Sequence, residues 1–352
     1  MARGLSYRSA GVDARRASRL VDTIAELARK TSRPEVLRGI GGFGALFRAP
    51  RRYRRPLWVA STDGVGTKLR VALAAARHRE VGIDLVAMNV NDVLTLGAEP
   101  LVFLDYFATG RLETRVAKEV LAGIAEGCRE AGCALVGGEI AELPSFYPGG
   151  EYDLAGFVVG VVEEKKVVDG RDVREGDAVI GLASAGLHSN GFSLVRRVLL
   201  DKAALPLDAR IPELGCRLAD ELLRPTRIYV PLVRRILTRF RVKAMAHITG
   251  GGLVENVPRV LPEGHGVVFW KGTWPVPPIF DLVARLGPVG EREMYRTFNM
   301  GVGFVLVVER KVAPELLGEL GRGGEQAWWI GEIRRGPRAA RFEKPKVGEK
   351  MP

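Results

Sequence analysis

The chain has 352 residues, a length that favours two domains over a single hydrophobic core. Its 47% hydrophobic and 27% charged residues are ordinary for a folded protein, and no apolar run reaches the roughly 20 residues of a membrane-spanning helix. Three cysteines without a CxxC pair fit neither a disulfide framework nor a zinc site. Because the first residues also lack the apolar segment of a secretory signal, we expect a cytoplasmic protein that does not bind membranes.

The net charge of +12 raises the question of nucleic-acid binding. The basic residues are scattered, with local runs at residues 51–55 and 334–350, and no DNA- or RNA-binding signature surrounds them. A solvated surface that attracts anionic substrates therefore explains the charge better than specific nucleic-acid binding.

In the first half of the chain, hydrophobic patterns predict helices and strands in alternation. In chain order they are a helix over residues 14–30, a strand over 57–61, a helix over 83–96, a strand over 101–107, a helix over 113–132, and strands over 134–136 and 153–162. The last strand is a long apolar run that suits the core of a sheet.

A charged, polar stretch at residues 163–176 predicts the domain boundary. Beyond it we expect strands over 178–183, 244–248, 266–270, 301–308 and 327–332, and helices over 191–200, within 216–240 and over 253–261. Alternating strands and helices predict an α/β fold in both halves. We assign residues 1–165 to the first domain, 166–340 to the second, and 341–352 to a disordered polar tail.

The first candidate site is a glycine-rich segment. Gly39, Gly41 and Gly44 match the GxGxxG pattern of dinucleotide-binding loops. However, no convincing strand precedes them, and Pro50 prevents a proper helix from following. The favoured interpretation is a flexible loop, with Gly41, Gly42 and Gly44, that covers a bound phosphate; a plain surface loop is the alternative.

A second glycine turn follows the strand at 57–61. Its two glycines allow backbone N–H groups to approach an anion, Lys68 adds a positive charge, and Asp63 could hold a divalent metal. The spacing is not that of a Walker A loop, and a tight turn without a ligand is the alternative. The candidate cofactor-binding residues of this turn are Asp63, Gly64, Gly66, Thr67 and Lys68.

Two further carboxylates are candidate metal ligands. Asp92 falls in an otherwise apolar helix, where a carboxylate is costly unless it is paired or bound to metal, and Glu139 follows a strand. Mg²⁺ prefers a few carboxylates together with substrate phosphates, so we favour a metal site that includes both residues. In the alternative, Asp92 is a buried partner of Lys68 or of an arginine, and Glu139 is the N-terminal acid of a helix.

Two turns in the second half lead into helices. His188 and Asn190 stand between a strand and a helix start, where anions bind and a side chain can act as a proton donor. The second turn consists of Thr249, Gly250, Gly251 and Gly252 and also precedes a helix. Phosphate binding is the favoured interpretation of this turn, and close packing of the backbone is the alternative.

A dozen segments, spread almost from end to end of the chain, match one family in order. They are residues 10–13, 39–47, 62–68, 82–88, 91–92, 97–100, 104–106, 127–139, 152–156, 188–191, 247–257 and 297–303. Through them the chain resembles the aminoimidazole ribonucleotide synthetase family. Ile140 and Leu143 depart from the threonine and methionine that are usual there, and Ile140 cannot supply a hydroxyl ligand.

The resemblance implies an ATP-dependent ring closure of formylglycinamidine ribonucleotide to 5-aminoimidazole ribonucleotide, with release of ADP and phosphate. It also implies roles for the residues above. Asp63, Asp92 and Glu139 would bind Mg²⁺, and Lys68 with the loop 41–44 would hold the ATP phosphates. His188 and Asn190 would orient the reacting amide or protonate near it, and the turn 249–252 would hold the ribonucleotide 5′-phosphate.

The resemblance further implies a two-domain α/β fold in which the N-terminal sheet closes a barrel with its twin across a homodimer. Selenophosphate synthetase and thiamine-phosphate kinase share the superfamily. A selenophosphate enzyme would carry a reactive cysteine near its N-terminus, whereas the first cysteine here is Cys128. A basic nucleic-acid-binding scaffold without catalysis is the alternative from another class, and the retention of every proposed ligand argues against it.

Overall fold

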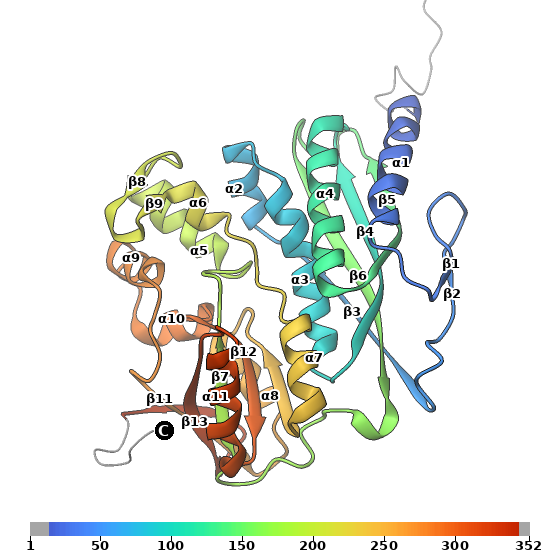
Figure 1. The fold of residues 1–352 in the computed structure, drawn as a ribbon. Helices are drawn as coiled ribbons and strands as arrows, with labels where there is room; N and C mark the ends of the chain where they lie inside the picture. The colour runs from blue at the N-terminus through green and yellow to red at the C-terminus, as the bar shows by residue number, and fades with distance from the viewer. Residues whose placement is uncertain (1–13, 345–352) are drawn as a thin grey trace, which may run out of the picture. The chain divides into compact units, whose positions relative to one another are not determined.

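The computed structural model describes residues 14–344, and the chain divides into two compact units (Figure 1). The first unit ends at Glu164, and the second begins at Lys165 and also takes in residues 94–97. This division falls beside the boundary expected from the charged stretch at residues 163–176. None of the helices within residues 14–344 combines the length and the apolar content needed to span a bilayer.

The first unit layers helices on a sheet. Its helices are α1 (Ala14–Arg29), α2 (Lys68–Ala75), α3 (Arg79–Leu94) and α4 (Thr114–Ala131), and its strands are β1 (Val36–Arg38), β2 (Leu46–Phe47), β3 (Pro56–Gly64), β4 (Glu99–Thr109), β5 (Ala134–Glu142) and β6 (Tyr152–Glu163). The strand order is β3-β6-β4-β5, so β3 and β5 form the edges. β4 and β5 run parallel, and the other neighbours are antiparallel.

Helices α3 and α4 pack with their backbones in direct contact. A Cβ atom added at Gly82 would overlap the Val120 carbonyl oxygen, and one added at Gly123 would overlap the Arg79 carbonyl oxygen. The other side of α4 is polar, whereas Val116, Val120 and Ile124 are buried. The glycines explain why the two helices lie so close together, and the amphipathic pattern explains which side of α4 is buried.

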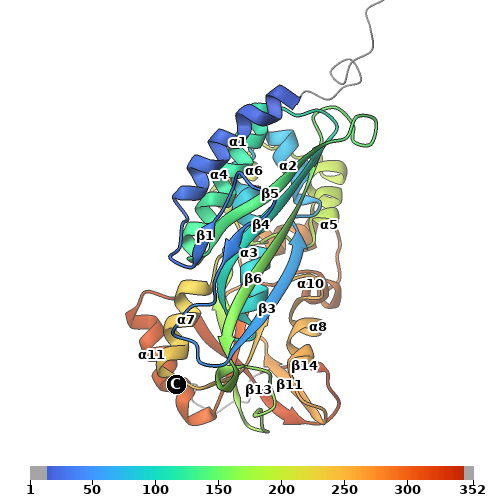
Figure 2. The same ribbon diagram turned by 90° about the vertical axis from the view of Figure 1, so that its right-hand side faces the viewer.

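The opposite face of this sheet is apolar and exposed. Trp58 on β3 and Phe157 on β6 keep 49% and 44% of their surface accessible. Figure 2 views this face, and the strands β3, β6 and β4 lie in front of the unit's helices. Phe47 of the β1–β2 ribbon meets Trp58 edge to face, with ring centroids 6.3 Å apart.

The second unit is built around a six-stranded sheet in the order β10-β12-β7-β13-β11-β14. Only the β11–β14 pair among these neighbours is parallel. The strands of this sheet are β7 (Ala178–Ala183), β10 (Val242–His247), β11 (His265–Trp270), β12 (Val302–Val308), β13 (Ala327–Arg335) and β14 (Ala340–Glu343). The unit's other two strands, β8 (Arg210–Ile211) and β9 (Cys216–Arg217), form a separate pair. Its helices are α5 (Phe192–Arg196), α6 (Leu218–Leu222), α7 (Val230–Arg239), α8 (Gly252–Arg259), α9 (Pro278–Leu286), α10 (Glu291–Thr297) and α11 (Ala313–Arg322).

The predicted α/β organisation of both halves is confirmed, but the tail assignment is wrong at its start. Residues 340–343 form β14, which pairs with β11. Phe342 explains the difference, because its ring packs 4.5 Å from that of Tyr295 and 5.4 Å from that of Phe269, measured between centroids. The rest of the predicted tail, residues 345–352, lies outside the described residues.

Candidate active site

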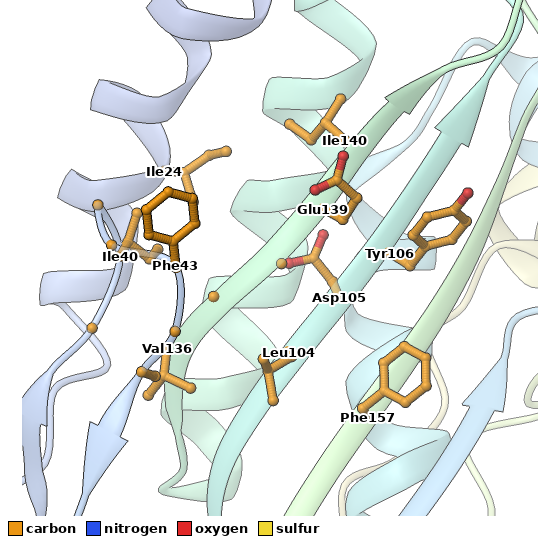
Figure 3. Close-up of a pocket in the computed structure, with 17 residues that line it drawn as sticks. Ile24, Ile40, Phe43, Leu104, Asp105, Tyr106, Val136, Glu139, Ile140 and Phe157 are labelled. Atoms are coloured by element: carbon orange, nitrogen blue, oxygen red, sulfur yellow. The ribbon is translucent and has the colours of Figure 1, made fainter.

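The glycine-rich segment joins β1 to β2 and forms one wall of a cavity of about 530 Å³. Strands β4 and β5 form the facing wall, and Ile24 of α1 closes one side. Figure 3 shows Phe43, at the loop, beside Ile24 and Ile40 and across from the strands that carry Asp105 and Glu139. Gly41 has a φ of 109°, a conformation that a residue with a side chain rarely adopts, so this glycine is needed for the loop's path.

The lining of this cavity is apolar except for two carboxyl groups and a phenol. Asp105 and Tyr106 come from β4, and Glu139 comes from β5. No lysine, arginine or histidine of the described chain lines it. The apolar lining consists of Ile24, Ile40, Phe43, Ala45, Leu104, Val136, Ile140 and Phe157. The cavity size suits a small organic ligand, and backbone N–H groups of the glycine loop are the donors available to an anion.

Glu139 lies inside a strand rather than after one. The expected strand at 134–136 continues to Glu142, so no helix begins at Glu139 and the helix-terminus alternative is wrong. Glu139 is exposed and stands opposite Tyr106 of β4. The segment of small residues at 137–138 concealed the strand, because glycine is depleted in strands.

Asp105 was missed as a site residue, although a charged residue in an otherwise apolar predicted strand was a visible signal. Its side chain is only 4% exposed. Burial raises the pKa of the Asp105 carboxyl to about 7. A carboxyl with a pKa near neutral can be either a hydrogen-bond donor or an acceptor under cellular conditions.

The turn after β3 has the expected position, but Lys68 does not reach its surface. Asp63 ends β3 and its carboxylate accepts a hydrogen bond of 2.8 Å from the Gly64 N–H. Lys68 begins α2 and is completely buried, with its Nζ 2.7 Å from an Asp84 carboxylate oxygen. The expected direct contact between Lys68 and a phosphate is therefore not available in this structure.

Asp92 lies on α3 facing β3. Ser61 Oγ donates a hydrogen bond of 3.4 Å to Asp92, and Asn89, one turn earlier, donates one of 3.2 Å to the Asp63 carbonyl. The structure thus brings the Asp63 backbone and Asp92 to the same junction between β3 and α3.

The third expected metal ligand is remote from this junction. Glu139 lies on β5, three strands from β3 in the sheet, which is roughly 14 Å at about 4.8 Å per strand. No group of three or more His, Cys, Asp or Glu residues within the described chain could hold a metal ion. One chain therefore does not assemble the predicted set of Asp63, Asp92 and Glu139.

In the second unit, His188 is buried rather than displayed. It is 1% exposed, has a φ of 60°, and its Nε2 accepts a hydrogen bond of 3.0 Å from the Ala185 N–H. Its ring lies 6.2 Å from that of Tyr229. Asn190, two residues on, is half-buried, and a Cβ atom at Gly250 would come within 3.6 Å of its side-chain oxygen. The two predicted turns of this unit therefore meet at Asn190.

The triple-glycine turn leads into α8, as expected. The Asn256 side chain donates hydrogen bonds to the carbonyls of Thr249, Gly250 and Gly252 at 3.3, 3.2 and 2.8 Å. Close packing explains Gly252, because a Cβ atom there would overlap the Tyr295 carbonyl oxygen. Gly250 has no such neighbour apart from Asn190, so its surface remains available to a ligand.

Two protein-family models match the chain. The N-terminal domain of AIR synthase related proteins matches residues 52–162, and the C-terminal domain matches residues 174–343. Together they cover most of both structural units.

Curated relatives match over nearly the whole length. The phosphoribosylformylglycinamidine cyclo-ligase of Myxococcus xanthus is 56% identical over 95% of this chain and 97% of its own. The enzyme of that name from Thermoanaerobacter pseudethanolicus is 54% identical over 94% of this chain and 97% of its own.

Solved structures with low sequence identity share the fold. A thiamine-monophosphate kinase from Stenotrophomonas maltophilia has a TM-score of 0.69 at 19% identity, covering 92% of this chain and 95% of its own. The hydrogenase maturation protein HypE in complex with ATP has a TM-score of 0.66 at 17% identity, covering 95% and 92%. The fold alone thus does not separate these activities, but the curated relatives do, and the chain belongs to the phosphoribosylformylglycinamidine cyclo-ligase family, as its motifs predicted.

Proposed function

We propose that this chain closes the imidazole ring of formylglycinamidine ribonucleotide, using ATP and releasing ADP and phosphate. The observation that carries the proposal is the 56% identity to a cyclo-ligase over 95% of the chain. An amide oxygen is a poor leaving group, so ATP first phosphorylates the formyl oxygen. The amidine nitrogen then attacks the activated carbon, phosphate departs, and the ring forms.

Phosphoryl transfer requires positioning and charge stabilisation more than covalent chemistry from the protein. The β3–α3 junction supplies oxygen ligands of the kind that Mg²⁺ prefers, from Asp63 and Asp92. The glycine loop 41–44 supplies backbone N–H groups for the ATP phosphates. The buried Lys68 contributes through its pair with Asp84, which fixes the start of α2 beside the turn 63–67.

A homodimer would complete the metal site. If two copies of the sheet β3-β6-β4-β5 close a barrel about a two-fold axis along its centre, the free edge β5 of one copy adjoins β3 of the other. Glu139 of one subunit then approaches Asp63 and Asp92 of the next. The exposed apolar face around Trp58 and Phe157 supports this assembly, because it would fill the barrel.

In the second unit, Asn190 and the turn 249–252 are the proposed site for the ribonucleotide 5′-phosphate. Gly250 and Gly251 bring backbone close to a ligand at the start of α8, where anions are favoured. His188 is proposed to orient the turn through the Ala185 N–H. Its burial argues against direct proton transfer to the substrate.

The proposed setting is the cytoplasm, with no specific nucleic-acid partner, because the positive charge is spread over the sequence. Retention of duplex DNA at physiological salt would contradict this part, since non-specific binding weakens steeply with salt.

The test of function is a coupled measurement of ADP release and aminoimidazole formation. The purified chain is supplied with Mg²⁺ and ATP, with and without formylglycinamidine ribonucleotide. We expect ADP release that depends on the substrate and matches the imidazole in amount. ATP binding without formation of the imidazole would indicate that the chain has the activity of another enzyme of this fold, such as a kinase.

A further inference from the structure

Asp105 occupies an unusual place in the sheet of the first unit. It stands in β4 opposite Gly138 of β5 on one side and Gly156 of β6 on the other. Side chains paired across strands share one face of a sheet, so both neighbours of the Asp105 side chain on that face are glycines. On the β5 side no side chain therefore stands between this carboxyl and the edge of the sheet, whereas the side chains of Asn89 and Phe103 fill the space beside Gly156.

Gly138 is the opening that leads to the cavity. It is exposed, although Asp105 beneath it is only 4% exposed, and both line the cavity beside the glycine loop. A Cβ atom at Gly138 would overlap Asp105 Oδ1. Any side chain at position 138 would therefore displace or cover the carboxyl. Glycine inside a strand often marks close approach by a ligand.

The Asp105 carboxyl has no side-chain partner within the described residues; its one hydrogen bond is to its own backbone N–H. Other buried carboxylates of the unit are paired: Glu99 with Arg33 and Arg52, and Asp84 with Lys68. Burying a polar group without a partner costs free energy, so such a group persists where function uses it.

We propose that Asp105 recognises, through the opening at Gly138, an N=C–NH₂ group of a ligand held in this cavity. A carboxyl group accepts a hydrogen bond from the amino group, and in its protonated form it also donates one to the adjacent nitrogen. The raised pKa of Asp105 supports this two-way pairing. No basic side chain of the described residues lines the cavity, so none there competes for the Asp105 carboxyl.

This inference rests on the proposed function, because both proposed ligands carry the group. The 6-amino edge of adenine in ATP contains N=C–NH₂. The amidine of the ribonucleotide substrate contains the same atoms and is protonated at neutral pH, so it would donate two hydrogen bonds to the ionised carboxyl. Ile24 of α1, with Ile40 and Phe43 of the glycine loop, lines the cavity and offers apolar surface against which a planar group can pack. Equilibrium binding distinguishes the two sources, since each ligand can be titrated alone.

The experiment compares two substitutions of Asp105 in the full-length chain by isothermal titration calorimetry. Asp105→Asn keeps one donor and one acceptor side by side, whereas Asp105→Leu has similar size and neither. With a non-hydrolysable ATP analogue and with formylglycinamidine ribonucleotide as separate probes, we expect Asp105→Leu to weaken one of them by about 10- to 100-fold. Asp105→Asn should stay within about 3-fold of the parent for the adenine edge, whereas it should weaken an amidinium as Asp105→Leu does, because an amide has no second acceptor.

A second pair of variants tests the opening itself. Gly138→Ala places a methyl group against the carboxyl and also within 2.7 Å of the Asp105 carbonyl oxygen. It should weaken the same ligand while Asp105 remains, and a thermal melt like that of the parent shows that the strand pairing is kept. Gly137→Ala is the steric control, because its Cβ atom would meet only Leu104 at an ordinary 3.6 Å. Gly137→Ala should bind that ligand more tightly than Gly138→Ala does.

If Asp105→Leu weakens binding of the ATP analogue alone, the recognised group is the adenine edge. If it weakens binding of the ribonucleotide alone, the recognised group is the amidine. Unchanged binding of both ligands by folded Asp105→Leu overturns the proposal. Equal weakening of both ligands that Asp105→Asn does not restore also overturns the proposal, because a collapsed cavity would produce that result. If the parent chain binds these ligands but forms no imidazole, only the proposed function is contradicted. The binding measurements do not depend on turnover, so the proposal for Asp105 is still tested.

Discussion

Lys68 and Asp84 form an ion pair in which neither side chain has any exposed surface. Bringing two charges out of water is costly, and their attraction compensates only while both are present. The pair also joins the start of α2 to α3, beside the proposed phosphate turn. Its main role at the residue scale is therefore to hold the turn in place.

Asp84→Asn should reduce the free energy of unfolding by about 3–5 kcal/mol, because it leaves the buried ammonium without its charged partner. The measurement is a urea titration at neutral pH. Glu119→Gln is the matched control, since Glu119 pairs with Arg115 on the exposed surface of α4. That change should cost less than about 0.5 kcal/mol. Similar losses in both variants would contradict a structural role for Lys68.

Asp92→Asn should retain the fold and lose turnover by at least about 10²-fold, because it removes a charge from the proposed Mg²⁺ site. Steady-state assays and a thermal melt of the same sample check both parts. Asp281→Asn, at an exposed carboxylate of α9, is the control and should leave turnover unchanged. Normal kinetics in Asp92→Asn would remove this residue from the metal set.

Asp105 should make stability depend on pH. An ordinary aspartate in the unfolded chain titrates near pH ~4, whereas the pKa of folded Asp105 is raised to about 7. Between these values the folded state keeps a proton that the unfolded chain has released. Its contribution to stability is therefore full below pH ~4 and is lost as pH rises to about 7, at up to roughly 1.4 kcal/mol per unit.

Asp105→Asn removes this titration. The variant's unfolding free energy, relative to the parent's, should increase from pH 4 to 7 and stay level above 7. Denaturant titrations across that range measure the difference. A difference that does not change with pH would show that the folded carboxyl has an ordinary pKa.

At the scale of elements, long regular segments could be read from the sequence and short or glycine-containing ones could not. The helices α3 and α4 and the strand β6 follow clear apolar patterns, and their predicted positions are confirmed within a few residues. The predicted strand at 134–136 stops before Gly137, whereas β5 continues to Glu142. The sequence does not predict α2, because its eight residues follow directly on the glycine turn. These elements depend on packing against neighbours that local patterns do not reveal.

Some residues of the candidate site could likewise be predicted from the sequence, and others could not. Asp63, Asp92 and the turn 249–252 were predicted at element ends or within helices, where the structure has them. Asp105 and the Lys68–Asp84 pair depend on which strand or helix lies opposite, and this follows from sheet order and helix packing. His188 is predicted to orient or protonate the reacting amide, but its side chain is buried beside Tyr229 and accepts a hydrogen bond from the Ala185 N–H.

The contact between α3 and α4 gives a prediction about glycine in helices. Gly123→Ala should destabilise the chain by about 1–3 kcal/mol, because the added methyl group meets the Arg79 carbonyl. Gly318→Ala in α11 is the matched control, since its Cβ atom would meet only the flexible Arg322 end at 3.5 Å. That change should stabilise by up to about 1 kcal/mol through helix propensity. Thermal melts that shift in the same direction would contradict this packing.

At the scale of the whole molecule, the exposed apolar face of the first sheet requires an explanation. Trp58, Phe157 and the nearby Leu46 are between 44% and 58% exposed. Exposed apolar side chains of this kind are typical of an interface, and stable dimers bury about 1,200–2,000 Å² in total. The separation of Glu139 from Asp63 and Asp92 within one chain points to the same partner, a second copy.

Trp58→Asp should therefore prevent the proposed dimer from forming and abolish turnover in the same protein. A charge on the inner face of the proposed barrel is costly to bury, whereas on a monomer's surface it is harmless, so the variant should remain folded. Light scattering gives the mass, and the imidazole assay gives the activity. Leu96→Asp is the control, because Leu96 is 37% exposed in the turn after α3, away from the sheet face. A fully active Trp58→Asp monomer would show that one chain binds the metal unaided, and the shared carboxylate set would have to be abandoned.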